Sequence, residues 1–383
     1  MKILFYLHRY PEFGGIEKVT EILTQYLEEK GHQISILSYI QNPTAFHYNS
    51  RISYYQMPNP DFKSNKNYLF MNRFLKEQQF DIIILQDSYA PIENVLFANI
   101  TNINSKIIIA EHNTPNSGWD IFKYIHTHTK LSFKNKLLTP YHYWNMYFRT
   151  KNRYKKLYRK ADKYVLLSNK FIPIFKKRSG ITNLHKCYSI NNPITIPIPP
   201  QRTILKQKEI LFVGRFTPQK GIDMLMDIWK ELSFKYPEWT LKLVGGGELE
   251  SYIIEYIKNN QIQNIKLEGF QKDTSLYYQN ASILCLTSIF EGWGLVLTEA
   301  MSRGCIPIAF QSFESITDII DNNLNGFLVP PFDIEIFITK IKQIIDNPKL
   351  RIEISHNAIS KSKKFTIENI GNKWEQLFKE ITQ

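Results

Sequence analysis

Short apolar runs alternate with amphipathic stretches along the first half of the chain, which is the pattern of β/α units. Mainly apolar runs of strand length occur at 2–7, 33–38, 81–86 and 106–110. The interval 16–30 has the spacing of an amphipathic helix and is closed by Gly31. Strands this apolar are typical of a parallel sheet, because helices cover both of its faces. We therefore predict an α/β domain.

The same alternation starts again after a proline-rich stretch. Asn192-Pro193-Ile194 and the run from Pro197 to Pro200 indicate an extended linker. Beyond it, mainly apolar runs of strand length recur at 210–213, 241–244, 265–270 and 282–287. A chain of 383 residues also exceeds the usual size of one hydrophobic core. The sequence therefore predicts two α/β domains, with the boundary at residues 195 and 196.

The stretch from Ser288 to Gly304 contains two glutamates, Glu291 and Glu299, at a junction of strand, loop and helix. Glycines directly after Glu291 end the apolar run and place this residue in a loop at the carboxyl end of a strand. Residues 295–303 have helical composition, and Gly304 fits the C′ position. Ligands bind at this edge of an open parallel sheet, where Glu299 could reach paired hydroxyls. The alternative is that both glutamates are merely solvated.

Two cations stand close together after the first strand of the second domain. Arg215 follows Gly214, and Lys220 precedes Gly221 at the start of a helical stretch. Arginine grips phosphate oxygens bidentately and lysine acts as a point charge, so this pair can stabilise a diphosphate. The alternative is a pair of solvated surface cations.

These features together resemble retaining, GT-B-fold glycosyltransferases of family 4, whose signature is two glutamates with seven residues between them. The resemblance extends over most of the chain and includes the Gly-Arg and Lys-Gly pairs. It implies two Rossmann-like domains that face each other across a cleft. It also implies an acceptor-side domain of residues 1–195, completed by a C-terminal helix at 365–383, and a donor-binding domain of residues 196–364.

The implied reaction is transfer of a sugar from a UDP- or GDP-sugar to an acceptor hydroxyl, with retention at the anomeric carbon. Glu299 would bind the ribose, and Glu291 would position sugar hydroxyls without acting as a base. Arg215 and Lys220 would neutralise the leaving diphosphate, so neither a metal nor a cofactor is expected. The residues expected at the reacting centre are Glu291, His112, Arg215 and Lys220. The other donor-binding positions are Gly15, Gly245, Phe270, Gly294 and Leu295.

The segment from Gln311 to Ser315 departs from the family pattern, which has a glycine-rich segment at this point. This departure leaves the identity of the donor sugar open. Asn169 likewise stands where a glutamate is common. The match returns at residues 325–330.

Composition narrows the class of protein. Apolar residues at 43% and charged residues at 22% are ordinary for a soluble protein, and no apolar run approaches the roughly 18 residues of a membrane span. The apolar piece at 3–7 is too short for the core of a signal peptide. Three cysteines far apart in the chain favour reduced thiols over a disulfide framework. We therefore expect a cytoplasmic protein.

The net charge of +13 favours a polyanionic partner. The basic segment, residues 123–163, contains twelve lysines and arginines and one acid, Asp162, interleaved with aromatic residues that include Trp144, Tyr147 and Phe148. This composition predicts peripheral binding to the anionic inner face of the plasma membrane. The alternatives are that the aromatic residues fill the domain core, or that the segment binds a soluble polyanionic glycan.

Binding at a membrane would bring the site to a lipid-linked or glycan acceptor, as in the assembly of bacterial lipopolysaccharide, O-antigen or capsule. Two other functions stay open: a GT-B nucleotide-sugar epimerase, which needs no acceptor, and a basic nucleic-acid-binding protein. The sequence contains no recognition-helix or RNA-binding signature, so we expect no nucleic acid partner.

Overall fold

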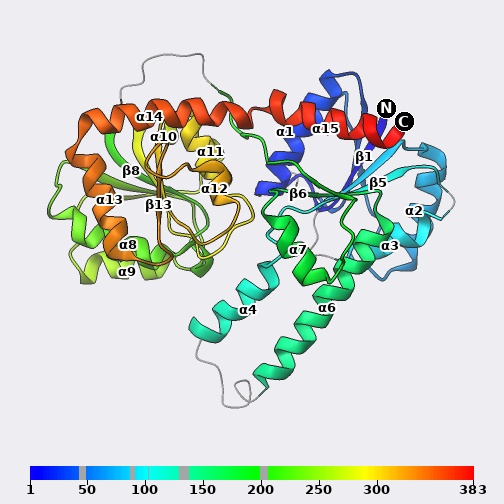
Figure 1. Ribbon diagram of the computed structural model, residues 1–383, viewed down its shortest axis with the longest axis horizontal. Helices are drawn as coiled ribbons and strands as arrows, with labels where there is room; N and C mark the ends of the chain where they lie inside the picture. The colour runs from blue at the N-terminus through cyan, green and yellow to red at the C-terminus, as the bar shows by residue number, and fades with distance from the viewer. Residues whose placement is uncertain (43–48, 87–90, 102, 129–137, 199–205) are drawn as a thin grey trace. The chain divides into compact units, whose positions relative to one another are not determined.

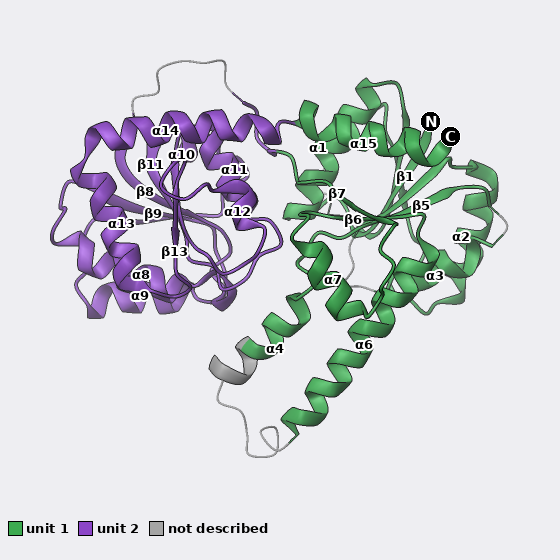
Figure 2. Ribbon diagram, viewed as in Figure 1, with its two compact units in different colours: residues 1–193, 367–383 green, residues 194–366 purple. Residues whose placement is uncertain are grey.

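The computed structural model describes residues 1–42, 49–86, 91–101, 103–128, 138–198 and 206–383, without the side chains of residues 124–128. The predicted linker residues Pro199 and Pro200 lie outside the described residues, as does the part of the basic segment from 129 to 137. The chain forms two compact units (Figure 2). Unit 1 consists of residues 1–193 and 367–383, and unit 2 of residues 194–366.

Unit 1 is built on a seven-stranded sheet of order β3-β2-β1-β4-β5-β6-β7. Every neighbouring pair of strands is parallel. Its strands are β1 Lys2–Arg9, β2 Gln33–Ile40, β3 Ser53–Gln56, β4 Ile82–Gln86, β5 Lys106–Ala110, β6 Lys163–Leu166 and β7 Cys187–Ser189. The central strand β4 is buried along its whole length, as its apolar sequence predicts.

The helices described in unit 1 are α1 Gly15–Glu29, α2 Asn65–Gln78, α3 Glu93–Asn99, α4 Ser117–His128, α6 Thr139–Lys160, α7 Phe171–Ser179 and α15 Ile367–Thr382. The last of them, α15, packs against α1, where Trp374 and Leu27 belong to one buried cluster. The hydroxyl of Tyr26 also donates a hydrogen bond to Asn372 Oδ1 at 2.8 Å. The C-terminal helix therefore contributes to the core of unit 1.

Unit 2 is built on a six-stranded parallel sheet of order β10-β9-β8-β11-β12-β13. Its strands are β8 Gln207–Val213, β9 Thr240–Val244, β10 Ile265–Gly269, β11 Ala281–Leu286, β12 Ile306–Phe310 and β13 Phe327–Val329. Its helices are η2 Pro218–Lys220, α8 Ile222–Ser233, α9 Glu250–Asn259, α10 Ser275–Asn280, α11 Leu295–Ser302, α12 Ile316–Ile319, α13 Ile334–Asp346, α14 Pro348–Ser362 and η3 Lys363–Phe365.

Both sheets have the strand order of a doubly wound fold, which reverses direction next to the first strand. The reversal lies between β1 and β4 in unit 1 and between β8 and β11 in unit 2. At such a point the two following loops turn to opposite faces of the sheet and leave a crevice at the carboxyl ends of the strands. The fold therefore gives each unit one favoured place for a ligand.

The aromatic residues of the basic segment have two different environments. Tyr154 and Tyr158, near the end of α6, are buried in unit 1. Trp144 and Phe148, by contrast, are 54% and 52% exposed on the part of α6 that extends away from the sheet (Figure 1). The core therefore takes up the aromatic residues at one end of the helix only. Among the described residues, no helix is both long and apolar enough to cross a membrane.

Candidate functional site

The residues predicted to bind a donor lie along one edge of the sheet of unit 2. Phe270 follows β10, Gly245 follows β9, Arg215 follows β8 with one glycine between, and Glu291 lies in the loop after β11. Because these strands are parallel neighbours, their carboxyl ends meet at the same edge. Four segments separated in sequence are thus brought together by strand order.

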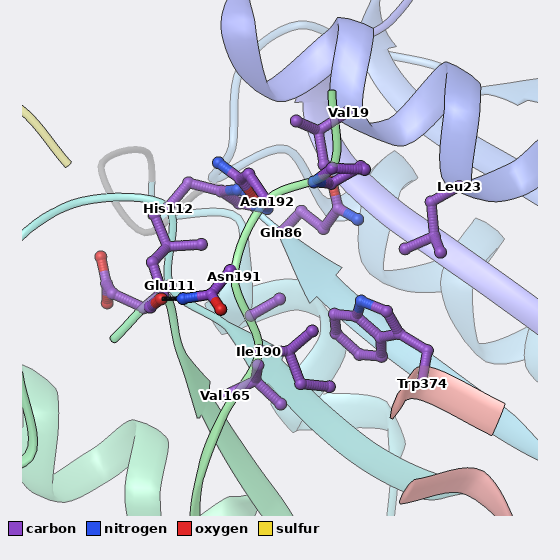
Figure 3. Close-up of a pocket in the computed structure, with 13 residues that line it drawn as sticks. Val19, Leu23, Gln86, Glu111, His112, Val165, Ile190, Asn191, Asn192 and Trp374 are labelled. Atoms are coloured by element: carbon purple, nitrogen blue, oxygen red, sulfur yellow. Dashed lines mark hydrogen bonds between the residues drawn. The ribbon is translucent and has the colours of Figure 1, made fainter. Parts of the chain in front are cut away.

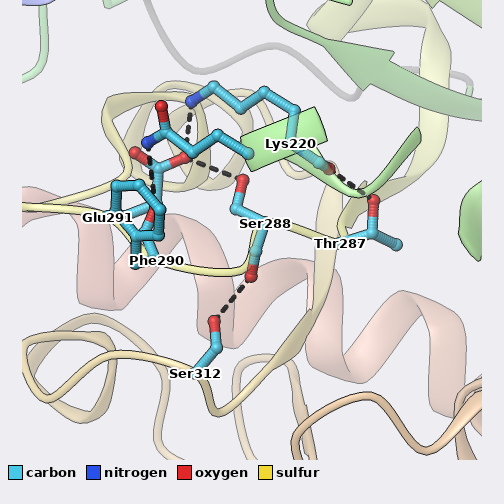
Figure 4. Close-up of polar contacts among 7 residues, drawn as sticks. Lys220, Thr287, Ser288, Phe290, Glu291 and Ser312 are labelled. Atoms are coloured by element: carbon cyan, nitrogen blue, oxygen red, sulfur yellow. Dashed lines mark hydrogen bonds and ion pairs between the residues drawn. The ribbon is translucent and has the colours of Figure 1, made fainter. Parts of the chain in front are cut away.

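An ion pair joins the two loops that flank the reversal of the sheet. Lys220 Nζ lies 2.5 Å from Glu291 Oε1, and the two side chains are only 19% and 12% exposed. The hydroxyl of Ser288 donates a second hydrogen bond to the same carboxylate oxygen at 2.7 Å (Figure 4). A partly buried charge pair with an additional hydrogen bond has a well-defined geometry. Lys220 and Glu291 therefore form one polar centre. Neither sequence motif by itself indicated that these two side chains are paired.

Backbone contacts hold the same two loops together. Gly221 has a φ of +60°, and a Cβ atom added to it would lie 2.2 Å from the carbonyl oxygen of Thr287, so this position requires glycine. The hydroxyl of Thr287 donates to the carbonyl of Lys220 at 2.9 Å. Gln219 accepts a hydrogen bond from the amide of Ile289 and donates one to the carbonyl of Phe290. The position of Lys220 is thus tied to the loop that carries Glu291.

Glycine also brings the loops after β8 and β9 into close contact. A Cβ atom on Gly245, whose φ is +138°, would lie 1.9 Å from the carbonyl oxygen of Gly214. The backbones of these two loops are therefore in close contact beside Arg215, which is exposed. Phe270, at the end of the same edge, is 61% exposed. An exposed cation and an exposed ring are groups that can bind a phosphate and stack on a base.

Glu299, the second glutamate of the signature, is buried and hydrogen-bonded, although the sequence pattern alone did not indicate these contacts. Glu299 lies in α11 and is 3% exposed. One carboxylate oxygen accepts a hydrogen bond from the Thr195 hydroxyl, and the other accepts one from the Tyr278 hydroxyl, at 2.7 Å for Tyr278. Burial raises the pKa of Tyr278 well above its usual 10, so its hydroxyl stays a donor. Gly294 is the N-cap of the same helix, and Leu295 is its first residue.

His112 lines a small pocket in unit 1, beyond the carboxyl end of β5 (Figure 3). Both of its ring nitrogens are buried and have no hydrogen-bond partner among the described residues, and the same holds for Gln86 Nε2 at the end of β4. Burial lowers the pKa of His112 to about 4, so the imidazole is neutral at neutral pH. Unpaired buried polar groups of this kind are available to hydrogen-bond a ligand hydroxyl.

Gly15, which is predicted to contact the donor, lies at the N-terminus of α1. Gly15 is the first residue of α1 and Gly14 is its N-cap. The carboxylate of Glu17 folds back over this end, since a Cβ atom on Gly14 would lie 2.1 Å from Glu17 Oε2. An acidic group already lies at this helix N-terminus, so a phosphate could bind there only if the Glu17 side chain moved away. Gly15 and His112 belong to unit 1, and the other predicted site residues belong to unit 2.

Several polar residues of the site could not be identified from the sequence. Thr195, Tyr278 and Ser288 contact the two glutamates, and only Ser288, three residues before Glu291, is near its partner in sequence. Gln86 is another, because its place in the pocket depends on the pairing of β4 with β5. Within the described part of the chain, no group of three or more His, Cys, Asp or Glu side chains could hold a metal.

Two family models match almost the whole chain. Residues 13–196 match the model described as Glycosyltransferase Family 4, and residues 195–361 match the model described as Glycosyl transferases group 1. A glycosyltransferase of Haemophilus influenzae whose activity is uncharacterised is 28% identical over 379 residues, which cover 98% of this chain and 99% of that protein. The amylovoran biosynthesis glycosyltransferase AmsD of Erwinia amylovora is 23% identical, with 98% of this chain and 99% of that protein covered.

Solved structures agree with these matches in fold. The structure of Alr3699/HepE of Anabaena in complex with UDP superimposes with a TM-score of 0.75 at 16% identity, covering 99% of this chain and 100% of that one. The resemblance seen in the sequence is thereby confirmed at the level of family and architecture. This chain belongs to the glycosyltransferases described by the group 1 and family 4 models and has the GT-B fold.

Proposed function

We propose that the protein transfers a sugar from a nucleotide-diphosphate sugar to a hydroxyl group of an acceptor, with retention at the anomeric carbon. The observation that supports this most strongly is the Lys220–Glu291 pair at the reversal of the sheet, with Arg215 exposed on the neighbouring loop. Two cations at the carboxyl edge provide a place for a diphosphate, and a carboxylate beside them provides a place for sugar hydroxyls. The Anabaena neighbour, which was solved with UDP, supports a nucleotide ligand.

Each site residue has a role in this proposal. Glu299 binds the ribose hydroxyls, and Phe270 stacks on the base. Arg215 and Lys220 hold the diphosphate and stabilise its charge as it leaves, a task for which a metal is then not required. Glu291 orients the donor sugar, and His112, as a neutral imidazole, contacts a hydroxyl of the transferred sugar.

Bond making and bond breaking occur on the same face of the sugar. The acceptor oxygen forms a bond to the anomeric carbon while the bond from this carbon to the diphosphate oxygen breaks. The proton of the acceptor hydroxyl passes to the leaving phosphate oxygen, so no protein base is needed. Attack and departure on one face give retention of configuration.

Turnover of a nucleotide sugar without added metal tests this function. We expect one of UDP-glucose, UDP-galactose, UDP-N-acetylglucosamine or GDP-mannose to raise the melting temperature of the protein, because a ligand of the native state stabilises it. The same compound should release its nucleoside diphosphate slowly in water and faster with an acceptor, and EDTA should not change the rate. Activity that disappears with EDTA and returns with Mg²⁺ or Mn²⁺ would contradict the proposed role of the two cations. Free sugar released at full rate without an acceptor would favour the epimerase.

We further propose that the acceptor is linked to a lipid and that α6 binds an anionic membrane surface. The relative named for amylovoran biosynthesis supports a role in the assembly of a polymer. Tyr141, Trp144 and Phe148 are exposed on one face of α6, at positions i, i+3 and i+7. Amphipathic aromatic rings bind at the headgroup boundary, and nearby cations are attracted to anionic lipid at about 1 kcal/mol each. Among the cations of α6, Arg149, Arg159 and Lys160 are exposed, whereas Arg153 and Lys156 face the buried carboxylate of Glu93.

Sedimentation with vesicles tests this binding. We expect the protein to sediment with vesicles that contain anionic phosphatidylglycerol, not with pure phosphatidylcholine, and less so as salt concentration rises. Trp144→Ser combined with Phe148→Ser should reduce binding at least tenfold, since both rings are exposed and their loss leaves the core intact. Phe234→Ser, which removes a ring of 59% exposure in unit 2, is the matched control and should bind as wild type does. Wild-type protein that ignores anionic vesicles at low salt would exclude this surface.

A further inference from the structure

The segment from Gln311 to Ser315 lies beside the loop that carries Glu291. The segment directly follows strand β12, which pairs in parallel with β11, so the carboxyl ends of these two strands are neighbours. The hydroxyl of Ser312 donates a hydrogen bond to the carbonyl of Ser288 at 2.6 Å (Figure 4). The hydroxyl of Ser315, which is fully buried, donates one to the carbonyl of Gly292 at 2.9 Å. Two serine hydroxyls of one segment thus bind the neighbouring loop.

The two carbonyl groups that accept these hydrogen bonds flank Glu291 in the sequence. One lies three residues before it and the other directly after it. On its other side the loop is held by Gln219, which bonds the backbone of Ile289 and Phe290. A loop whose carbonyls are satisfied from both sides keeps the position of its side chains, because a buried carbonyl that loses its donor costs about 1–3 kcal/mol.

We propose that Ser312 and Ser315 are positioning residues for the sugar transfer: their hydroxyl groups fix the loop from which Glu291 meets the donor sugar. This inference rests on the proposed function. The serines lie where the sequence departs from the glycine-rich pattern, and glycine has no hydroxyl with which to make either bond. In this chain, the hydroxyl groups of two serines therefore hold the loop that carries Glu291 through hydrogen bonds. Neither serine contacts the carboxylate itself, so both act through the backbone.

The burial of the two serines predicts different effects when the hydroxyl is removed. Ser315 is inaccessible to water, so the carbonyl of Gly292 has no replacement donor in Ser315→Ala. Ser312 is partly exposed, and water can replace its hydroxyl. We expect kcat to fall about tenfold in Ser315→Ala and about threefold in Ser312→Ala. Ser312→Thr keeps the hydroxyl and should retain the wild-type kcat within twofold.

A loss confined to kcat would separate positioning from a general structural role. Ser282→Ala is the matched control, because Ser282 is also buried and its hydroxyl bonds the carbonyl of Gln207, but it lies at the opposite end of β11. The measurements are kcat for the nucleotide sugar that turns over fastest, Kd for UDP by calorimetry, and the melting temperature. UDP lacks the transferred sugar that Glu291 is proposed to contact, so the Kd of the serine variants for UDP should stay within twofold of wild type.

The outcomes distinguish this inference from the proposed function. In a Glu291→Gln background, Ser315→Ala should cause almost no further loss, since it acts through Glu291. The inference is overturned if Ser315→Ala lowers kcat no more than Ser282→Ala does, or if the losses remain fully additive with Glu291→Gln. Wild-type protein that neither binds UDP nor turns over any of the four nucleotide sugars would overturn the proposed function itself.

Discussion

Glu299→Ala is expected to abolish measurable binding of UDP. A carboxylate that accepts two hydrogen bonds from the ribose contributes about 1.5–3 kcal/mol for each, so its removal should raise Kd by more than about 100-fold. Calorimetric titration with UDP measures the effect directly. Glu255→Ala, which removes an exposed carboxylate from α9, is the control and should bind UDP as wild type does.

The hydrogen bonds of Glu299 within unit 2 require a second variant. Glu299→Ala leaves the buried hydroxyl of Tyr278 without its acceptor, which should destabilise the fold by about 1–3 kcal/mol. Glu299→Gln keeps one oxygen in place and should fold with less loss, yet still bind UDP weakly because the charge is gone. The melting temperature of each variant shows how much of the effect is loss of stability. A folded Glu299 variant that binds UDP as tightly as wild type would contradict the proposed contact between Glu299 and the ribose.

Arg215→Ala and Lys220→Ala should each lower kcat by about 100- to 1000-fold, with a much smaller effect on affinity for the donor. The negative charge of the leaving diphosphate is fully developed only in the transition state, where one well-placed donor contributes about 3–4 kcal/mol. Initial rates at saturating donor give kcat, and calorimetry with UDP gives ground-state affinity. Lys230→Ala, which removes an exposed cation from α8, should leave both unchanged.

The two cations differ in what else their removal changes. Lys220 pairs with Glu291, so Lys220→Ala also leaves this carboxylate with only the hydroxyl of Ser288 among these contacts. Arg215 is exposed, and its removal changes the local charge without disturbing that pair. Arg215→Ala is therefore the cleaner measure of charge stabilisation. An affinity loss with kcat intact at saturating donor would show that the cations bind the ground state and the transition state equally.

Local pattern was sufficient to predict most elements of the two sheets. The apolar runs at 106–110 and 241–244 coincide with β5 and β9 within one residue, and the helix expected at 295–303 is α11, Leu295–Ser302. Such runs are informative because a strand that is covered by helices on both faces of the sheet is apolar at nearly every position. The helix expected at 16–30 starts one residue earlier, at Gly15, because backbone geometry decides which residues of a helix end are helical.

Composition could not separate the two kinds of aromatic residue in the basic segment. Tyr154 and Trp144 occupy the same helix and have similar neighbours in sequence, but one is buried and the other is exposed. The difference arises because the end of α6 near Tyr154 packs against α7, where the ring centroids of Tyr154 and Phe175 lie 5.1 Å apart. Burial of a helix face depends on its neighbours in space, which periodicity does not identify.

The sequence by itself determined the parallel α/β class, the family, and the placement of Arg215, Gly245 and Glu291 beyond the ends of apolar runs of strand length. These conclusions follow from the local hydrophobic pattern and from short motifs, each of which spans only a few consecutive residues. Only the tertiary structure decided that Lys220 pairs with Glu291, that Tyr278 and Thr195 hold Glu299, and that Ser312 and Ser315 bond the loop beside them. The reason is that these partners lie on different loops and helices, and the order of strands in the sheet, which no local pattern encodes, sets these segments side by side.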